Sequence, residues 1–193
     1  MKLSLIVAAA AASLLLGSVA VAHTVVYDAV LSSILPGSLG TGFAEVTVDY
    51  DLGTMDVEAS FSGLTGTVTA SHIHCCTVVA GVTTAGVATT TPTFPGFPLG
   101  GTSGTYSHVF NLLDAGSYNP AFVTANTNVN GAYAALGVGM DTDHAYFNIH
   151  TSAAPGGEIQ GFLIAQAVPE ASTSLMLGLG LIGLGGWARR RRG

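Results

Sequence analysis

The chain has 193 residues, of which 49% are hydrophobic and 8% are charged, and its formal net charge is −6. Its five basic residues are Lys2 and Arg189 to Arg192, so the interval from His23 to Val168 contains ten carboxylates and no Lys or Arg. This interval of about 146 residues is long enough for one domain with a well-buried core. Because such a surface repels a phosphate backbone, the composition excludes nucleic-acid binding.

The first 22 residues have the pattern of a cleavable signal peptide. Lys2 precedes an apolar run over residues 3–16, and small residues occupy positions 19–22. Ala20 and Ala22 form the A-x-A pattern that signal peptidase recognises, so we expect cleavage before His23. A retained anchor is the weaker interpretation, because the apolar run is shorter than the ~20 residues of a membrane span.

Apolar and polar residues alternate with a period of two over most of residues 23–167, which predicts β-strands. The alternation is clearest over 45–50 and 55–61, and the four residues 51–54 between these runs predict an antiparallel hairpin. We expect further strands near residues 24–32, 68–77, 86–91, 104–112, 143–151 and 158–166. So many short strands predict an all-β sandwich or barrel.

Two segments depart from this alternation. Residues 82–104 are rich in Thr, Gly and Pro and predict a long ordered loop with a short strand inside it. Asn119-Pro120 resembles a helix cap with a first-turn proline, and Asn130 precedes an alanine-rich run that ends at Gly139. We therefore expect short helices in a crossover loop.

The last 26 residues consist of three parts: Val168-Pro169-Glu170-Ala171, an apolar glycine-rich run over 175–187, and the basic block Arg189, Arg190, Arg191 and Arg192. A short apolar helix followed by cations is oriented with its arginines in the cytoplasm, which places the preceding domain outside. This order resembles the PEP-CTERM sorting signal that exosortase systems of Gram-negative bacteria process, with Ala171 in place of the motif's second proline. A plain membrane anchor is the alternative.

The region between these signals resembles the chordin-type, or CHRD, domain. The matching stretches are Gly40-Thr41-Gly42 with the strand 44–49, Phe61-Ser62-Gly63-Leu64, Ser71-His72-Ile73-His74, 145–151 and 155–161. The resemblance implies an extracellular Greek-key β-sandwich of immunoglobulin-like or dismutase-like type, and it implies no defined activity. The expected domains are thus a signal peptide over 1–22, a CHRD-like sandwich over 23–167, and a sorting signal with a transmembrane helix over 168–193.

Three histidines form the candidate metal site. His72 and His74 are two residues apart on a predicted strand, so both leave the same face, and parity places His150 on the matching face of another strand. If these strands are neighbours, three imidazoles can converge on copper or zinc, with a tyrosine or Asp143 as a further ligand. The alternative is a hydrogen-bonded polar cluster without metal.

The histidine pattern also resembles part of the copper site of copper/zinc superoxide dismutases. The sequence nevertheless has no second group of three histidines with an aspartate for zinc, and it has no arginine in this region to attract superoxide. We therefore do not expect dismutase activity, and no residue pattern predicts a catalytic group.

Cys75 and Cys76 are the only cysteines. Export to an oxidising compartment favours a disulfide between these neighbours. Two thiols, intermolecular bridges, or soft ligands for copper(I) beside His74 are the alternatives.

Two functional hypotheses follow. The first is a non-enzymatic binding or structural module of the cell envelope, outer surface or extracellular matrix of a Gram-negative bacterium. Its partners would be signal peptidase, an exosortase-type enzyme, the inner membrane transiently, and extracellular polysaccharide or surface proteins. The second is a copper- or zinc-binding protein with a redox or metal-carrier role.

Overall fold

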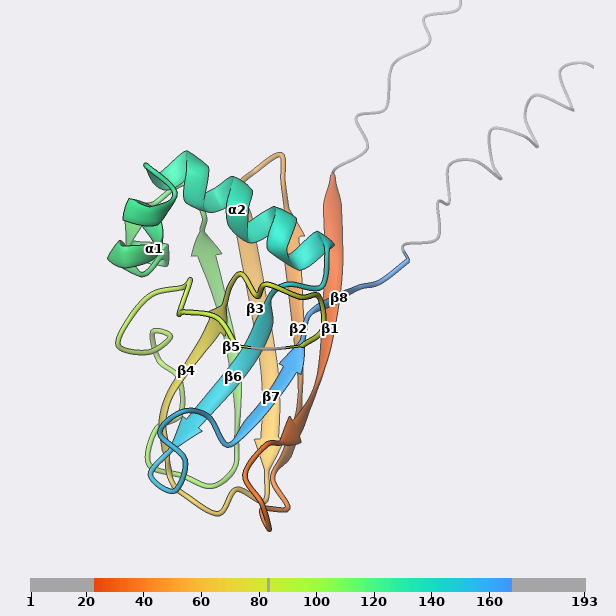
Figure 1. Ribbon diagram of the computed structural model, residues 1–193, viewed down its shortest axis with the longest axis vertical. Coiled ribbons are helices and arrows are strands. Elements are labelled where there is room, and N and C mark those ends of the chain that lie inside the picture. Colours follow the sequence, from red (N-terminus) through yellow and green to blue (C-terminus); the bar gives the residue numbers. More distant parts are fainter. Residues whose placement is uncertain (1–22, 83, 168–193) are drawn as a thin grey trace, which may run out of the picture.

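The structure is a computed structural model, and it describes residues 23–82 and 84–167 (Figure 1). The predicted signal peptide (1–22) and the predicted sorting signal (168–193) lie outside the described residues, as do their sequence motifs. Within the described part of the chain, no helix is long and apolar enough to cross a membrane.

The described residues form one antiparallel sheet with short helices. The strands follow the order β4-β6-β7-β1-β2-β3-β5, with β8 beside β1. The elements in chain order are β1 (Thr24–Ser33), β2 (Thr41–Asp49), β3 (Thr54–Ser62), β4 (Val68–His74), β5 (Gly104–Asn111), the 3-10 helix η1 (Ala115–Ser117), α1 (Pro120–Ala125), α2 (Val129–Asp141), β6 (Tyr146–Thr151), β7 (Ile159–Phe162) and β8 (Ile164–Ala165).

The sheet curls at β1, so that its two halves face each other. β1 pairs with β2 along nearly its whole length, whereas only Ser32 and Ser33 pair with β7. As a result, β4, β6 and β7 lie across β1, β2, β3 and β5 as a second layer, with α1 and α2 in the crossover from β5 to β6 (Figure 1). The prediction of an all-β sandwich with short crossover helices is confirmed.

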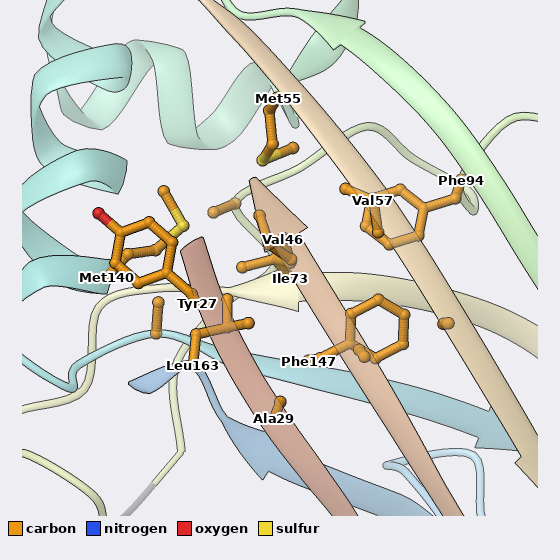
Figure 2. Packing of buried hydrophobic residues seen from close by; sticks show 14 of the residues in the cluster. Tyr27, Ala29, Val46, Met55, Val57, Ile73, Phe94, Met140, Phe147 and Leu163 are labelled. Carbon is orange, nitrogen blue, oxygen red and sulfur yellow. The ribbon is translucent and has the colours of Figure 1, made fainter. Parts of the chain in front are cut away.

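The core lies between these layers. Val46 and Val57 point inward from β2 and β3, and Ile73 and Phe147 point inward from β4 and β6; all four are fully buried (Figure 2). Buried residues alternate with more exposed ones along β1, β2, β3 and β5, as half-buried strands require.

The loop from 82 to 103 closes the side of the sandwich between β4 and β5. Phe94 is fully buried there, with its ring centroid 5.1 Å from that of Phe110 and 5.8 Å from that of Phe147. The strand expected near 86–91 is replaced by isolated bridges at Val87 and Thr89. The reason is that backbone hydrogen bonds from this loop go to different elements, β4 and the start of α1, and so build no continuous ladder.

Both α-helices begin at asparagine caps, and the sequence indicated the first of them, Asn119. The Asn119 side chain accepts a hydrogen bond from the backbone N–H of Ala121, and the Asn128 side chain accepts one from Gly131. The second helix begins at Val129, because Asn128, two residues before the expected Asn130, supplies the cap. Met140 near the end of α2 is fully buried against the core (Figure 2).

Glu158 is a fully buried carboxylate that ties four segments together. Its oxygens accept hydrogen bonds from the Ser38 and Thr151 hydroxyls, both at 2.6 Å, and from the backbone N–H groups of Thr65 (2.5 Å) and Gly66 (3.0 Å). Burial alone would raise the pKa of this carboxyl, but the four donors lower it from 4.5 to about 2. The ionised carboxylate is therefore stabilised without a cation.

Replacing this carboxylate tests its role in stability. We expect Glu158→Gln to lower the free energy of unfolding at pH 7 by about 3 kcal/mol, because the amide presents its own N–H groups to donors that now lack an acceptor. Since the pKa is depressed in the fold, the wild-type advantage is complete above pH 4.5 and disappears as the pH falls toward about 2.

Denaturant unfolding across pH measures this difference. The matched control is Glu58→Gln, which changes an exposed glutamate on β3 and should leave stability nearly unchanged. Equal effects of the two substitutions would contradict the assignment.

Candidate metal centre on strands β4 and β6

The three candidate histidines lie on one face of the β4–β6 pair. His72 is opposite Asn148 in the register, His74 is opposite Tyr146, and Ala70 is opposite His150. Because residues two apart share a face, the three imidazoles leave the sheet on the side away from the core, while Ile73 and Phe147 fill the core.

The rings converge to a distance suited to a metal ion. One ring nitrogen from each histidine lies within 4.8 Å of the other two. The ring centroids are 5.2 Å apart for His72 and His150, 5.4 Å for His74 and His150, and 5.9 Å for His72 and His74. Two ligands on opposite sides of an ion with nitrogen bonds of about 2 Å are about 4 Å apart, so small side-chain adjustments suffice for binding.

Backbone carbonyls orient all three rings. Each ring places one nitrogen against a carbonyl oxygen: His72 Nε2 with Pro92 at 2.8 Å, His74 Nδ1 with Ala85 at 2.9 Å, and His150 Nδ1 with Pro155 at 2.8 Å. A carbonyl only accepts, so the nitrogen facing it carries the proton. The neutral rings therefore present lone pairs at Nδ1 of His72 and at Nε2 of His74 and His150.

These lone pairs have no donor in the described part of the chain. His72 Nδ1 is buried without a hydrogen-bond partner there. His74 Nε2 and His150 Nε2 lie 3.3 Å apart, and two lone pairs at that distance do not form a hydrogen bond with each other. Buried polar atoms without partners are rare, and a metal ion would satisfy all three nitrogens at once.

Protonation of the rings is opposed by their surroundings. Burial, together with the neighbouring imidazoles, lowers the pKa of His72 to about 4, although the hydrogen bond to the Pro92 carbonyl raises it. Burial likewise lowers the pKa of His74 and of His150. The rings are therefore neutral near pH 7, which is the state that binds a metal.

The neighbouring residues give the cluster a neutral environment. The Tyr146 ring stacks on His74 with centroids 4.8 Å apart, and its hydroxyl lies 3.3 Å from the carbonyl oxygen of Ala85. Asn148 is 1% exposed and donates from Nδ2 to the Gly156 carbonyl at 3.2 Å. The cluster found among the described residues contains the three histidines alone, so Asp143 is not part of it.

His144 lies outside this cluster although it shares the strand parity of His150. Its Nδ1 lies 2.6 Å from the carbonyl oxygen of Thr77, in the segment that follows β4. The alternation of faces along β6 does not apply to His144, because that strand begins at Tyr146, two residues later.

The two cysteines directly follow the end of β4 and lie against α2. Cys75 and Cys76 are joined by a disulfide across a cis peptide bond. Cys75 belongs to the buried core with Ile73, and both sulfurs lie against the carbonyl oxygen of Ala135 in α2. The structure thus separates the disulfide from the imidazoles, whereas the sequence left open a shared site.

Three functional groups were missed by sequence reasoning: the carbonyl oxygens of Ala85, Pro92 and Pro155. They belong to loops, and every residue type carries the same carbonyl. Only the folded positions of the loops identify these atoms as partners of the rings.

Comparison with known proteins gives two matches to family models. The CHRD domain matches residues 27–163, and the PEP-CTERM protein-sorting motif matches residues 167–192. Neither the curated proteins nor the solved structures contain a match to this chain.

The ring orientations predict a specific pattern of tautomers in the metal-free protein. Nitrogen-15 NMR should find the proton on Nε2 of His72 and on Nδ1 of His74 and His150. On lowering the pH, His72 should stay neutral until about pH 4, because burial depresses its pKa. A His72 ring that titrates near 6.5, or that carries its proton on Nδ1, would refute this arrangement.

Proposed function

This chain belongs to the CHRD domain family, and we propose that it is a non-enzymatic, exported module that binds one copper or zinc ion through His72, His74 and His150. The proposal rests on the approach of one nitrogen of each ring to within 4.8 Å of the others, and on ring lone pairs that have no hydrogen-bond donor among the described residues. The function is binding at the cell envelope, and the ion has a structural or carrier role.

The C-terminal motif supports the location. A PEP-CTERM protein-sorting motif over residues 167–192 implies sorting by an exosortase system and export to the envelope or surface of a Gram-negative bacterium. We further propose that signal peptidase cleaves before His23, and that the C-terminal segment holds the chain in the inner membrane only until processing. Binding to extracellular polysaccharide or to surface proteins stays a prediction.

The ligand chemistry favours copper or zinc over harder ions. Imidazole nitrogen suits both metals, whereas calcium and magnesium require mostly oxygen ligands. Three histidines leave a fourth position of a tetrahedral ion for water or another small ligand. The carbonyl partner of each ring also matches the outer-shell hydrogen bonds of protein metal sites.

The charge distribution argues against dismutase activity. Residues 23–167 carry ten carboxylates and no Lys or Arg, so the domain repels an anionic substrate such as superoxide. Among the described residues, the three histidines form the one group suited to a metal ion. The described part of the chain therefore has no second group that corresponds to the zinc site of a copper/zinc dismutase.

The same geometry suggests what the ion would do for the protein. His74 is hydrogen-bonded to Ala85 and His72 to Pro92, both in the loop that closes the sandwich, while His150 is bonded to Pro155 in the β6–β7 turn. An ion shared by the three rings would link these two loops through β4 and β6. Metal binding should therefore stabilise the fold.

Metal content tests the proposal directly. Exported protein loaded with copper or zinc and then freed of excess ion should retain one ion per chain, and the ion should raise the unfolding temperature, since only the folded state has the assembled site. The double variant His72→Ala, His74→Ala should lose both effects.

His108→Ala is the matched control, because His108 lies on β5 outside the cluster. It should keep the ion and the thermal shift. A wild-type protein that retains no ion and shows no shift with either metal would refute metal binding.

The sorting assignment has a separate test. Deletion of residues 168–193 should release the domain from the cells, because the truncated chain lacks the segment recognised by the sorting system. Fractionation and immunoblotting of medium and envelope measure the effect. Unchanged retention at the surface would contradict the assignment.

A further inference from the structure

We propose that the Cys75–Cys76 disulfide is a reversible two-electron redox site, which exchanges with small organic thiols through the sulfur of Cys76. This site is independent of the proposed metal centre. It follows the end of β4 and lies against α2, whereas the imidazoles of His72 and His74 leave β4 on the face away from the core.

The two cysteines differ in exposure. Cys75 is 5% exposed and is part of the hydrophobic core, while the neighbouring Cys76 is exposed. Thiol–disulfide exchange requires a thiolate to reach one sulfur while the other leaves. The structure thus assigns Cys76 as the sulfur that is attacked and Cys75 as the leaving group.

A groove beside Cys76 can hold the attacking molecule. Its volume is about 480 Å³, within the range of small-molecule sites. The lining is mostly apolar and comes mainly from α2 and its C-cap, together with Cys76 and His144; the residues from α2 include Ala134, Ala135 and Val138. The groove therefore suits the carbon body of a small thiol.

The site also accommodates the reduced state. The carbonyl oxygen of Ala135 lies 3.5 Å from Cys76 Sγ and 3.9 Å from Cys75 Sγ. A disulfide has no S–H to donate, but a thiol does, so this acceptor becomes useful only after reduction. Gly139 leaves room for the sulfurs, because a Cβ there would lie 2.3 Å from Cys75 Sγ.

The exchange proceeds in two balanced steps. An external thiolate attacks Cys76 Sγ, a bond forms between the two sulfurs, and the Cys75–Cys76 bond breaks with its electron pair on Cys75, which takes a proton from water. A second external thiolate then attacks the external sulfur of this mixed disulfide, and Cys76 leaves as a thiolate. The products are one external disulfide and the protein dithiol, so two thiols are oxidised for each disulfide reduced.

Redox titration of the exported protein with reduced and oxidised glutathione tests reversibility. Samples are quenched with an alkylating reagent, and mass spectrometry measures the number of alkylated cysteines per chain. We expect a native protein that changes between no alkylated cysteine and two as the glutathione ratio varies, and that returns to the disulfide when the ratio is reversed. A disulfide that glutathione reduces only in the unfolded protein would overturn the proposal.

Single-cysteine variants test which sulfur reacts. In Cys75→Ser, the remaining Cys76 thiol should form a mixed disulfide with oxidised glutathione at least about tenfold faster than Cys75 does in Cys76→Ser, because access limits the rate. Circular dichroism establishes that both variants are folded. Equal rates in folded variants would contradict the assignment of Cys76 as the attacked sulfur. The redox titration uses the wild-type protein, so the test of reversibility does not depend on the folding of either variant.

Discussion

The antiparallel pairing of β4 with β6 is the constraint on which the rest of the structure depends. It places Ile73 and Phe147 in the core and, by the same alternation, directs His72, His74 and His150 to the opposite face. A slip of one residue would exchange the two faces and put imidazoles into the core, so burial of the apolar residues specifies the register of the histidines. The candidate metal centre is thus a consequence of the packing of the sandwich.

A domain without Lys or Arg must stabilise its buried polar groups by other means. Glu158 does so with two hydroxyl and two backbone N–H donors from three other segments. The histidines do so by remaining neutral and donating to backbone carbonyls. In both cases the partner atoms come mainly from loops, so the precise course of the loops determines the chemistry of the strands. The lone pairs on the far side of the imidazoles are among the buried polar groups that have no partner in the described part of the chain.

Strand parity was sufficient to predict the general fold and the shared face of the three histidines. It also placed the β2–β3 hairpin, and the Asn-Pro pair at 119–120 located the start of α1. Parity was not sufficient for residues 86–91, where the chain forms single bridges to separate elements. It also did not predict the tautomers, because these depend on carbonyl oxygens of Ala85, Pro92 and Pro155 that carry no sequence signal. The position of Cys75 and Cys76 relative to the imidazoles likewise depended on where β4 ends.

We propose that three ring nitrogens, one each from His72, His74 and His150, form the binding site of one ion. X-ray absorption spectroscopy of the protein loaded with one equivalent of zinc or copper measures those ligands directly. The account predicts about three imidazole nitrogens at about 2.0 Å with the outer scattering of histidine rings. A first shell made only of oxygen, or one dominated by sulfur at about 2.3 Å, would contradict it.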